Sequence, residues 1–248
     1  MNHATSSPAF FVGWDVGGWN CDRNRRSRDA LVILDETLAV VGRPWRGNLR
    51  DTLNQAADTQ AFLDRLFELC QAGPHPDSTH VTLAVDTPLG FSQAFIGLLT
   101  RGQVTEPIEG VSGANPYLYR LTERELFDLG LSPLSAVKDM IGSQATKGIH
   151  VLAKFAPTVA SCGVWRGGAS LTVLEAYPAA CASSATLAEL REQVADPPDQ
   201  PDEKDALICA LIAYLFGHQR EQLLGPCAYV PESEGWIWVP KDIKQAAS

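Results

Sequence analysis

The 248-residue chain has few of the residues from which zinc sites and disulfide frameworks are built. Its six cysteines include no C-x-x-C pair, and its five histidines include no pair at the spacing of metal ligands. Zinc sites and disulfide-rich domains both need such pairs. The cysteines are therefore expected to be buried thiols.

Long apolar runs and an excess of positive charge are also missing. No apolar stretch approaches the roughly 18 to 20 residues that a membrane-spanning helix needs, so no integral membrane protein is expected. The net charge of -9 works against non-specific affinity for a polyanion, because Lys and Arg supply that affinity. The first residues, MNHATSSPAFF, include neither the basic nor the apolar segment of a secretory signal, so a cytoplasmic location is expected.

One basic segment, CDRNRRSRD, stands out from this acidic average. It lies between two predicted strands and is expected to form a loop. The pattern is typical either of a loop that contacts phosphates or of a solvated turn balanced by Asp22 and Asp29. Its arginines are Arg23, Arg25, Arg26 and Arg28.

The distribution of apolar residues predicts one α/β domain over residues 1–248. A helix is predicted over residues 48–71, and a second, apolar almost all round, over DALICALIAYLFG. An insertion is predicted at about 90–168, because turn-rich and helical pieces alternate there without a clear order. Strands are predicted at 10–16, 29–35, 38–43, 80–86 and in SLTVLEAYP.

The order of these elements favours a ribonuclease H-like mixed sheet, in which three antiparallel strands are continued by parallel strands. Residues 29–35 and 38–43 are predicted to form an antiparallel hairpin. Doubly wound nucleotide-binding folds would need a crossover helix where this hairpin lies. The insertion is placed after the fourth strand.

Acidic residues recur where the predicted strands end. Asp15, Asp86 and Glu175 each lie at or near the carboxyl end of a strand. Asp202 and Asp205 open the apolar helix, about one helical turn apart. Carboxylates that meet at one edge of a sheet are how an α/β domain builds a divalent-metal site. These five acids are the candidate metal ligands.

Each acid also has a structural explanation. Asp15 suits a turn into the following glycines, and Asp86 suits the cap of a following helix. A nearby Arg or Lys would satisfy Glu175 as well as a cation would. Asp202 at the N-cap with Asp205 at N3 would make an approximate capping box.

The blocks GWDVGG, AVDTPLG, EAYP, DALICALIAYLFG and EGWIWVP, in this order, resemble a known family. The family is called domain of unknown function 429, and its members are described as predicted nucleases of the ribonuclease H fold. The segment NPYLYRLTE, with Arg120, Thr122 and Glu123, is similar to a further block inside the insertion. The resemblance spans nearly the whole chain.

The resemblance implies roles for individual acids. Asp15 matches the first-strand aspartate that bridges two metals, Asp86 the acid ending the central strand, and Asp205 the acid of the closing helix. Asp202 is similar to an additional helix acid of resolvase-like members, and Glu175 matches the E-x-x-P block. The helix start DEKD departs from the pattern because it has no histidine. No histidine there could assist the attacking water or the leaving group.

The leading hypothesis is therefore a Mg²⁺- or Mn²⁺-dependent nuclease or phosphodiesterase that acts on nucleic acid or a nucleotide. Asp15, Asp86 and Asp205 would be catalytic, holding two cations about 3.5 to 4 Å apart. The arginines of the basic segment, together with Arg120, would bind the substrate, and Lys138, Lys147 and Lys154 of the insertion are further candidates for contacts with its backbone. The sequence leaves open whether the substrate is DNA, RNA, a junction or a small nucleotide, and what the oligomeric state is.

Two other hypotheses remain. In a phosphotransferase of the sugar-kinase and actin type, backbone amides of Gly17 and Gly18 would hold a phosphate. That architecture normally needs two copies of the core fold, for which one chain of this length is short. A binding module that kept the fold and lost the chemistry is the other alternative.

Overall fold

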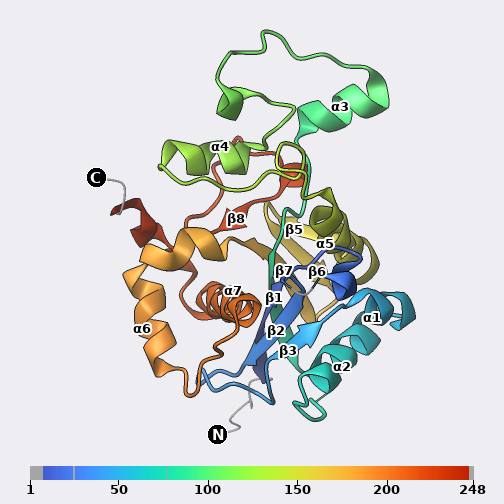
Figure 1. Cartoon of the computed structure of the whole chain (residues 1–248), viewed down its shortest axis with the longest axis vertical. Coiled ribbons are helices and arrows are strands. Elements are labelled where there is room, and N and C mark those ends of the chain that lie inside the picture. The colour runs from blue at the N-terminus through green and yellow to red at the C-terminus, as the bar shows by residue number, and fades with distance from the viewer. Residues whose placement is uncertain (1–7, 25, 77, 246–248) are drawn as a thin grey trace, which may run out of the picture.

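The computed structural model of the chain describes residues 8–24, 26–76 and 78–245. A mixed β-sheet with helices on both faces forms the centre of the molecule (Figure 1). Its strands follow the order β3-β2-β1-β4-β7-β6-β5, and β8 pairs with β7. The α/β fold class is therefore confirmed. The strands are β1 Ala9–Asp15, β2 Asp29–Leu34, β3 Trp45–Gly47, β4 His80–Asp86, β5 Thr158–Ser161, β6 Val164–Gly167, β7 Leu171–Ala176 and β8 Ile237–Trp238.

The strand directions bring two predicted site residues together. β1, β2 and β3 pair antiparallel, whereas β4 is parallel to β1 and β7 is parallel to β4. In the parallel β1–β4 pair, Asp15 lies directly opposite Asp86. One strand further along, Val85 lies opposite Glu175. The three acid-bearing strand ends therefore lie at the same edge of the sheet.

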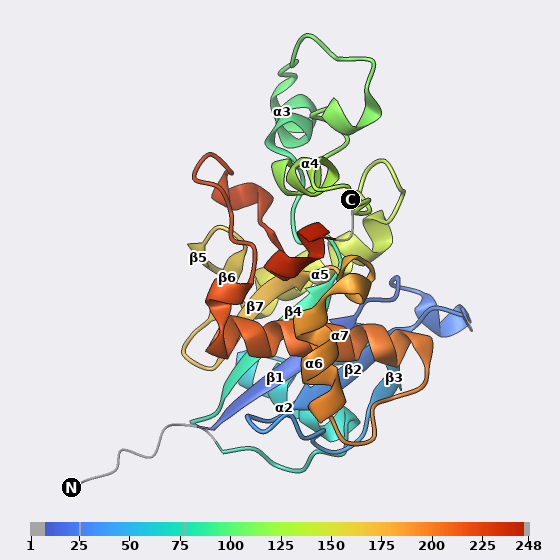
Figure 2. The same ribbon diagram turned by 90° about the vertical axis from the view of Figure 1, so that its left-hand side faces the viewer.

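Helices cover the two faces unequally. The helix α7, with α6 beside it, packs on one face, and α1, α2 and α5 pack on the other (Figures 1 and 2). None of the helices in the described part of the chain is long and apolar enough to span a membrane. The α-helices are α1 Arg50–Gln55, α2 Thr59–Leu69, α3 Gln93–Arg101, α4 Leu121–Asp128, α5 Gly142–Phe155, α6 Ala185–Gln193 and α7 Pro201–His218.

A glycine in β1 lets α7 approach the sheet very closely. A Cβ atom added at Gly13 would lie 1.8 Å from the carbonyl oxygen of Ala206 and 2.4 Å from the amide nitrogen of Ala210. The helix backbone therefore rests on the strand backbone. Most of α7 is buried, as its apolar sequence predicts. This contact brings the start of α7, with its acids, to the end of β1.

The third strand is not where the sequence predicts it. The prediction at 38–43 is wrong, because the strand lies at Trp45–Gly47, and Val40 makes only an isolated bridge to Leu34. The carboxylate of Asp35 accepts hydrogen bonds from two amides of the following turn, and Leu38 has a φ of 63°. Residues that were predicted to lie in the next strand form this tight turn instead.

The predicted helix over residues 48–71 is interrupted. It forms α1 and α2 instead, and Asp58 starts the second helix by accepting a hydrogen bond from the amide of Ala61 at 2.9 Å. Asp is a favoured N-cap residue, so this break has a local cause.

Part of the region predicted as an insertion belongs to the sheet. The strands β5 and β6 extend the sheet beyond β7, and α5 packs on its face. These two strands were not predicted. The segment from α3 to α4 instead projects beyond the sheet (Figure 2).

Candidate functional site at the carboxyl edge of the sheet

Three carboxylates from separate elements lie near the carboxyl edge of the sheet. Asp15 and Asp86 end adjacent parallel strands, and Asp205 lies near the start of α7. Asp15 and Asp86 are half-buried, whereas Asp205 is exposed. Within the described residues, none of the three side chains forms a hydrogen bond or an ion pair. They therefore have no neutralising protein partner there.

Burial and neighbouring negative charges raise the pKa of all three acids. Burial, together with the negative charges of Asp86 and Asp205, raises the pKa of Asp15 to about 9. Burial raises the pKa of Asp86 to about 8, assisted by Asp205 and Glu175. The pKa of Asp205 is raised by burial and by Asp202. Carboxylates that repel one another in this way are poorly stabilised as anions unless a cation lies between them.

A cavity of about 240 Å³ opens beside these acids, and we call it the edge cavity. Asp15, Asp86 and Glu175 contribute its acidic lining. Ser27 borders it from the basic segment, residues 21–29, which we call the arginine loop, so this loop and the acids lie around one space.

Asp15, Asp86 and Asp205 offer only carboxylate oxygens, the ligand type that Mg²⁺ and Mn²⁺ prefer. This donor chemistry fits a hard divalent cation. Among residues 8–24, 26–76 and 78–245, however, no three His, Cys, Asp or Glu side chains are grouped closely enough to hold an ion as they stand.

Glu175 is already paired. Its two carboxylate oxygens accept hydrogen bonds from the guanidinium of Arg120 at 2.6 and 2.8 Å, and one of them also accepts from the amide of Leu89 at 2.9 Å. Both charged side chains are buried. Glu175 is therefore neutralised by an arginine, which is the explanation other than metal binding that the sequence allowed for this acid.

Arg120 has no free surface to offer a substrate. It is 3% exposed, and its guanidinium also bonds to Glu123 and to the carbonyl oxygen of Glu234. These contacts tie α4 to β7 and to the C-terminal segment. The structure thus gives Arg120 a structural role in a buried charge network.

Asp202 is paired as well. Its carboxylate accepts hydrogen bonds from Nε of Arg46 at 2.7 Å and from the amide of Arg28 at 3.1 Å. Gln200, rather than Asp202, is the N-cap of α7, so the capping box does not form. Asp202 joins the arginine loop to the start of α7.

The arginine loop provides the positive charge beside the edge cavity. Arg23 and Arg26 are exposed, and Arg28 is half-buried with its Nε donating to the carbonyl oxygen of Asn24 at 3.3 Å. Arg25 lies outside the described residues. Exposed guanidinium groups at this place could contact phosphates of a bound substrate.

Comparisons with known protein families, curated proteins and solved structures find no match for this chain. The resemblance to the family of unknown function therefore rests on its sequence blocks.

A buried ion pair beside Asp15 was missed by the sequence analysis. Asp29 and Lys147 are both fully buried and pair with each other. Asp29 also accepts hydrogen bonds from the amide of Gly17 at 2.8 Å and from the indole of Trp14 at 3.1 Å. The turn expected to be stabilised by Asp15 is thus held by Asp29, which leaves the carboxylate of Asp15 free.

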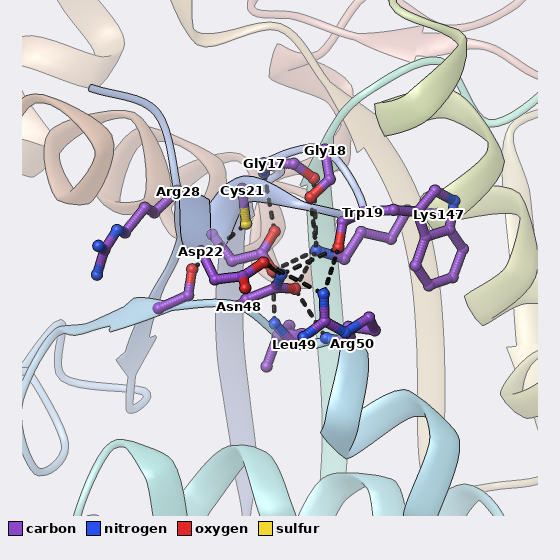
Figure 3. Close-up of polar contacts among 12 residues, drawn as sticks. Gly17, Gly18, Trp19, Cys21, Asp22, Arg28, Asn48, Leu49, Arg50 and Lys147 are labelled. Atoms are coloured by element: carbon purple, nitrogen blue, oxygen red, sulfur yellow. Dashed lines mark hydrogen bonds and ion pairs between the residues drawn. The ribbon is translucent and has the colours of Figure 1, made fainter. Parts of the chain in front are cut away.

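Lys147 extends this contact to the helix α5, and the expectation that it contacts the substrate backbone is wrong because its side chain is fully buried. Its ammonium group donates to the carbonyl oxygens of Gly17 and Gly18 and to the side chain of Asn48 at 3.1 Å (Figure 3). The sequence does contain a signal for this role. Lys147 lies four residues before Val151, on the apolar face of α5, where a lysine needs a partner.

Proposed function

We propose that this protein is a divalent-metal-dependent phosphodiesterase of the ribonuclease H-like fold that acts on nucleic acid. One observation carries the proposal: Asp15 lies opposite Asp86, the negative charge of Asp205 helps to raise the pKa of both, and no described residue pairs with any of the three. A cluster of carboxylates without a counter-charge is unfavourable for folding. A bound divalent cation would remove that cost, and its charge would then favour an approaching phosphate.

The arrangement of strands supports the same proposal. The order β3-β2-β1-β4-β7, with three antiparallel strands followed by two parallel ones, agrees with a ribonuclease H-like sheet. In such a sheet the acid of the first strand, the acid of the central strand and the acid of the closing helix lie together. Asp15, Asp86 and Asp205 would correspond to these three acids.

The residues divide into ligands and supports. Asp15, Asp86 and Asp205 would hold Mg²⁺ or Mn²⁺, which supplies an activated water and stabilises the leaving oxygen when bound. Asp202 and Glu175, engaged by Arg46 and Arg120, would add negative charge beside these ligands. The exposed Arg23 and Arg26 would contact the phosphates of the substrate.

The first prediction concerns Asp15→Asn. Replacing this carboxylate by an amide of equal size should reduce Mn²⁺-dependent cleavage of nucleic acid by at least about 100-fold, because the amide binds a cation weakly. The measurement is cleavage of labelled DNA and RNA in Mn²⁺, with thermal unfolding to verify that the variant is folded.

Asp128→Asn is the matched control, because Asp128 is an exposed acid at the end of α4, away from the edge cavity. This control should retain full activity. Undiminished cleavage by Asp15→Asn, or wild-type cleavage that persists in excess EDTA, would contradict the proposed function.

A further inference from the structure

We infer that the substrate is single-stranded nucleic acid, which places one unpaired base in the edge cavity while its phosphate lies at Asp15 and Asp86. The inference rests on the proposed function and names its substrate class. Four properties of the edge cavity support it: apolar walls, hydrogen-bonding groups without partners, small volume and little positive charge around it.

The walls away from the acids are apolar. Pro133, Leu134, Ile141 and Tyr177 all line the edge cavity. Leu134 is 52% exposed although it is a large apolar residue, and the hydroxyl of Tyr177 donates to the carbonyl oxygen of Ser132 at 2.8 Å, which fixes the position of the ring. Apolar and aromatic surfaces of this kind bind the faces of a nucleobase, and do so for any base.

Two polar groups at the edge cavity have no partner. Thr87 is 4% exposed, and its Oγ1 atom is buried without a hydrogen bond among the described residues. Gln144 is half-buried, lines the same cavity, and its amide makes no hydrogen bond within the described part of the chain. Polar groups that line a cavity normally find a partner, so the amide of Gln144, with its donors and acceptor, points to a ligand that carries both kinds of group. The edge of a nucleobase carries both.

The volume of the cavity limits what can enter. About 240 Å³ is less than the roughly 300 Å³ at which common small-molecule sites begin, so the cavity has room for about one nucleotide unit. A base inside a duplex is stacked and paired, and it would have to be flipped out to enter. An unpaired base enters without that cost.

The charge of the protein also disfavours a duplex. Double-stranded DNA is held mainly through Lys and Arg contacts to its phosphates, but the chain has a net charge of -9. The exposed Arg23 and Arg26 of the arginine loop would supply only two such contacts. Affinity must therefore come from contacts with the base, which a single strand can provide and an intact duplex cannot.

The test compares one 20-nucleotide strand, as DNA and as RNA, with the blunt duplex of the same sequence. Cleavage is measured in Mn²⁺ and binding in Ca²⁺. The single strand should be bound and cleaved at least about 10-fold better than its duplex.

Leu134→Ala should weaken binding of the single strand by about 5-fold or more, because it removes part of the apolar wall. Leu99→Ala is the matched control: Leu99 is 65% exposed on α3 and does not line the edge cavity. This control should bind as the wild type does.

The outcomes separate this inference from the proposed function. Equal cleavage of duplex and single strand, or unchanged single-strand binding by Leu134→Ala, would overturn this inference alone. Absence of metal-dependent cleavage of every probe by the wild-type protein would overturn the proposed function.

Discussion

Five acids that resemble one another in the sequence differ in the structure by their partners. Asp202 and Glu175 are held by Arg46 and Arg120, whereas Asp15 and Asp86 have no partner among the described residues. The sequence places each acid near a strand end or a helix start. It does not show which acids are neutralised, because each arginine lies more than fifty residues away along the chain.

The raised pKa of Asp15 leads to a prediction about stability and pH. Its pKa is about 9 in the folded protein against an ordinary value of 3.8, so the folded state keeps a proton that the unfolded state has released. The stability present below pH 3.8 is therefore lost as the pH rises toward 9. In EDTA, the free energy of unfolding should fall between about pH 5 and pH 9.

Asp15→Asn should flatten this decline and stabilise the metal-free protein at pH 8 by about 2 kcal/mol, because the amide does not titrate and folding then no longer requires this side chain to take up a proton. Urea unfolding across this pH range measures both effects. Added Mg²⁺ should oppose the decline in the wild type. If the stability of the wild type rose with pH, or if the variant followed the same slope, Asp15 would not lie among unneutralised acids.

The helix α7 and the strand β1 are the two elements that build the site. The apolar sequence of α7 predicts burial, but only the contact with Gly13 explains how its start reaches the end of β1. Gly13→Ala should therefore be severely destabilising, by about 3 kcal/mol or more, because a methyl group there overlaps backbone atoms of α7.

Thermal or urea unfolding of the purified variant measures this effect. Gly110→Ala is the control, since a Cβ atom added at Gly110 meets nothing within 4 Å. A loss of stability at Gly13 no larger than that at Gly110 would show that α7 does not rest on β1 in this way.

The elements that the sequence predicted correctly have strong local patterns. β1, β4, β7 and α7 are apolar and well bounded, and each was predicted. β3 has three residues, and β5 is exposed along most of its length, so neither has a clear pattern. These short strands form because a neighbouring strand offers hydrogen bonds, which local sequence does not encode.

Because the molecule as a whole is acidic, we expect its phosphate contacts to come mainly from the arginine loop. Each phosphate neutralised on a single strand contributes roughly 0.7 to the slope of log affinity against log salt. Replacing Arg23 and Arg26 together by Gln should therefore reduce that slope by about 1.4.

Binding of the single strand in Ca²⁺ over a series of salt concentrations measures this slope. The double variant Arg166→Gln with Arg191→Gln is the control, because it removes the same charge from exposed positions in β6 and α6. It should leave the slope nearly unchanged. If both double variants lowered the slope equally, the loop would have no special role in binding phosphates.

From the residues alone one can derive an α/β chain, an apolar closing helix and acids at the ends of its strands, because periodicity and the ends of apolar runs are local properties. The tertiary structure alone decides that Asp15 faces Asp86 in register, that Asp29 and Lys147 hold the turn beside them, and that arginines engage Asp202 and Glu175. These are contacts between distant parts of the chain. Burial and the Coulomb interaction depend on distance in space, and the order of residues along a chain does not contain that distance.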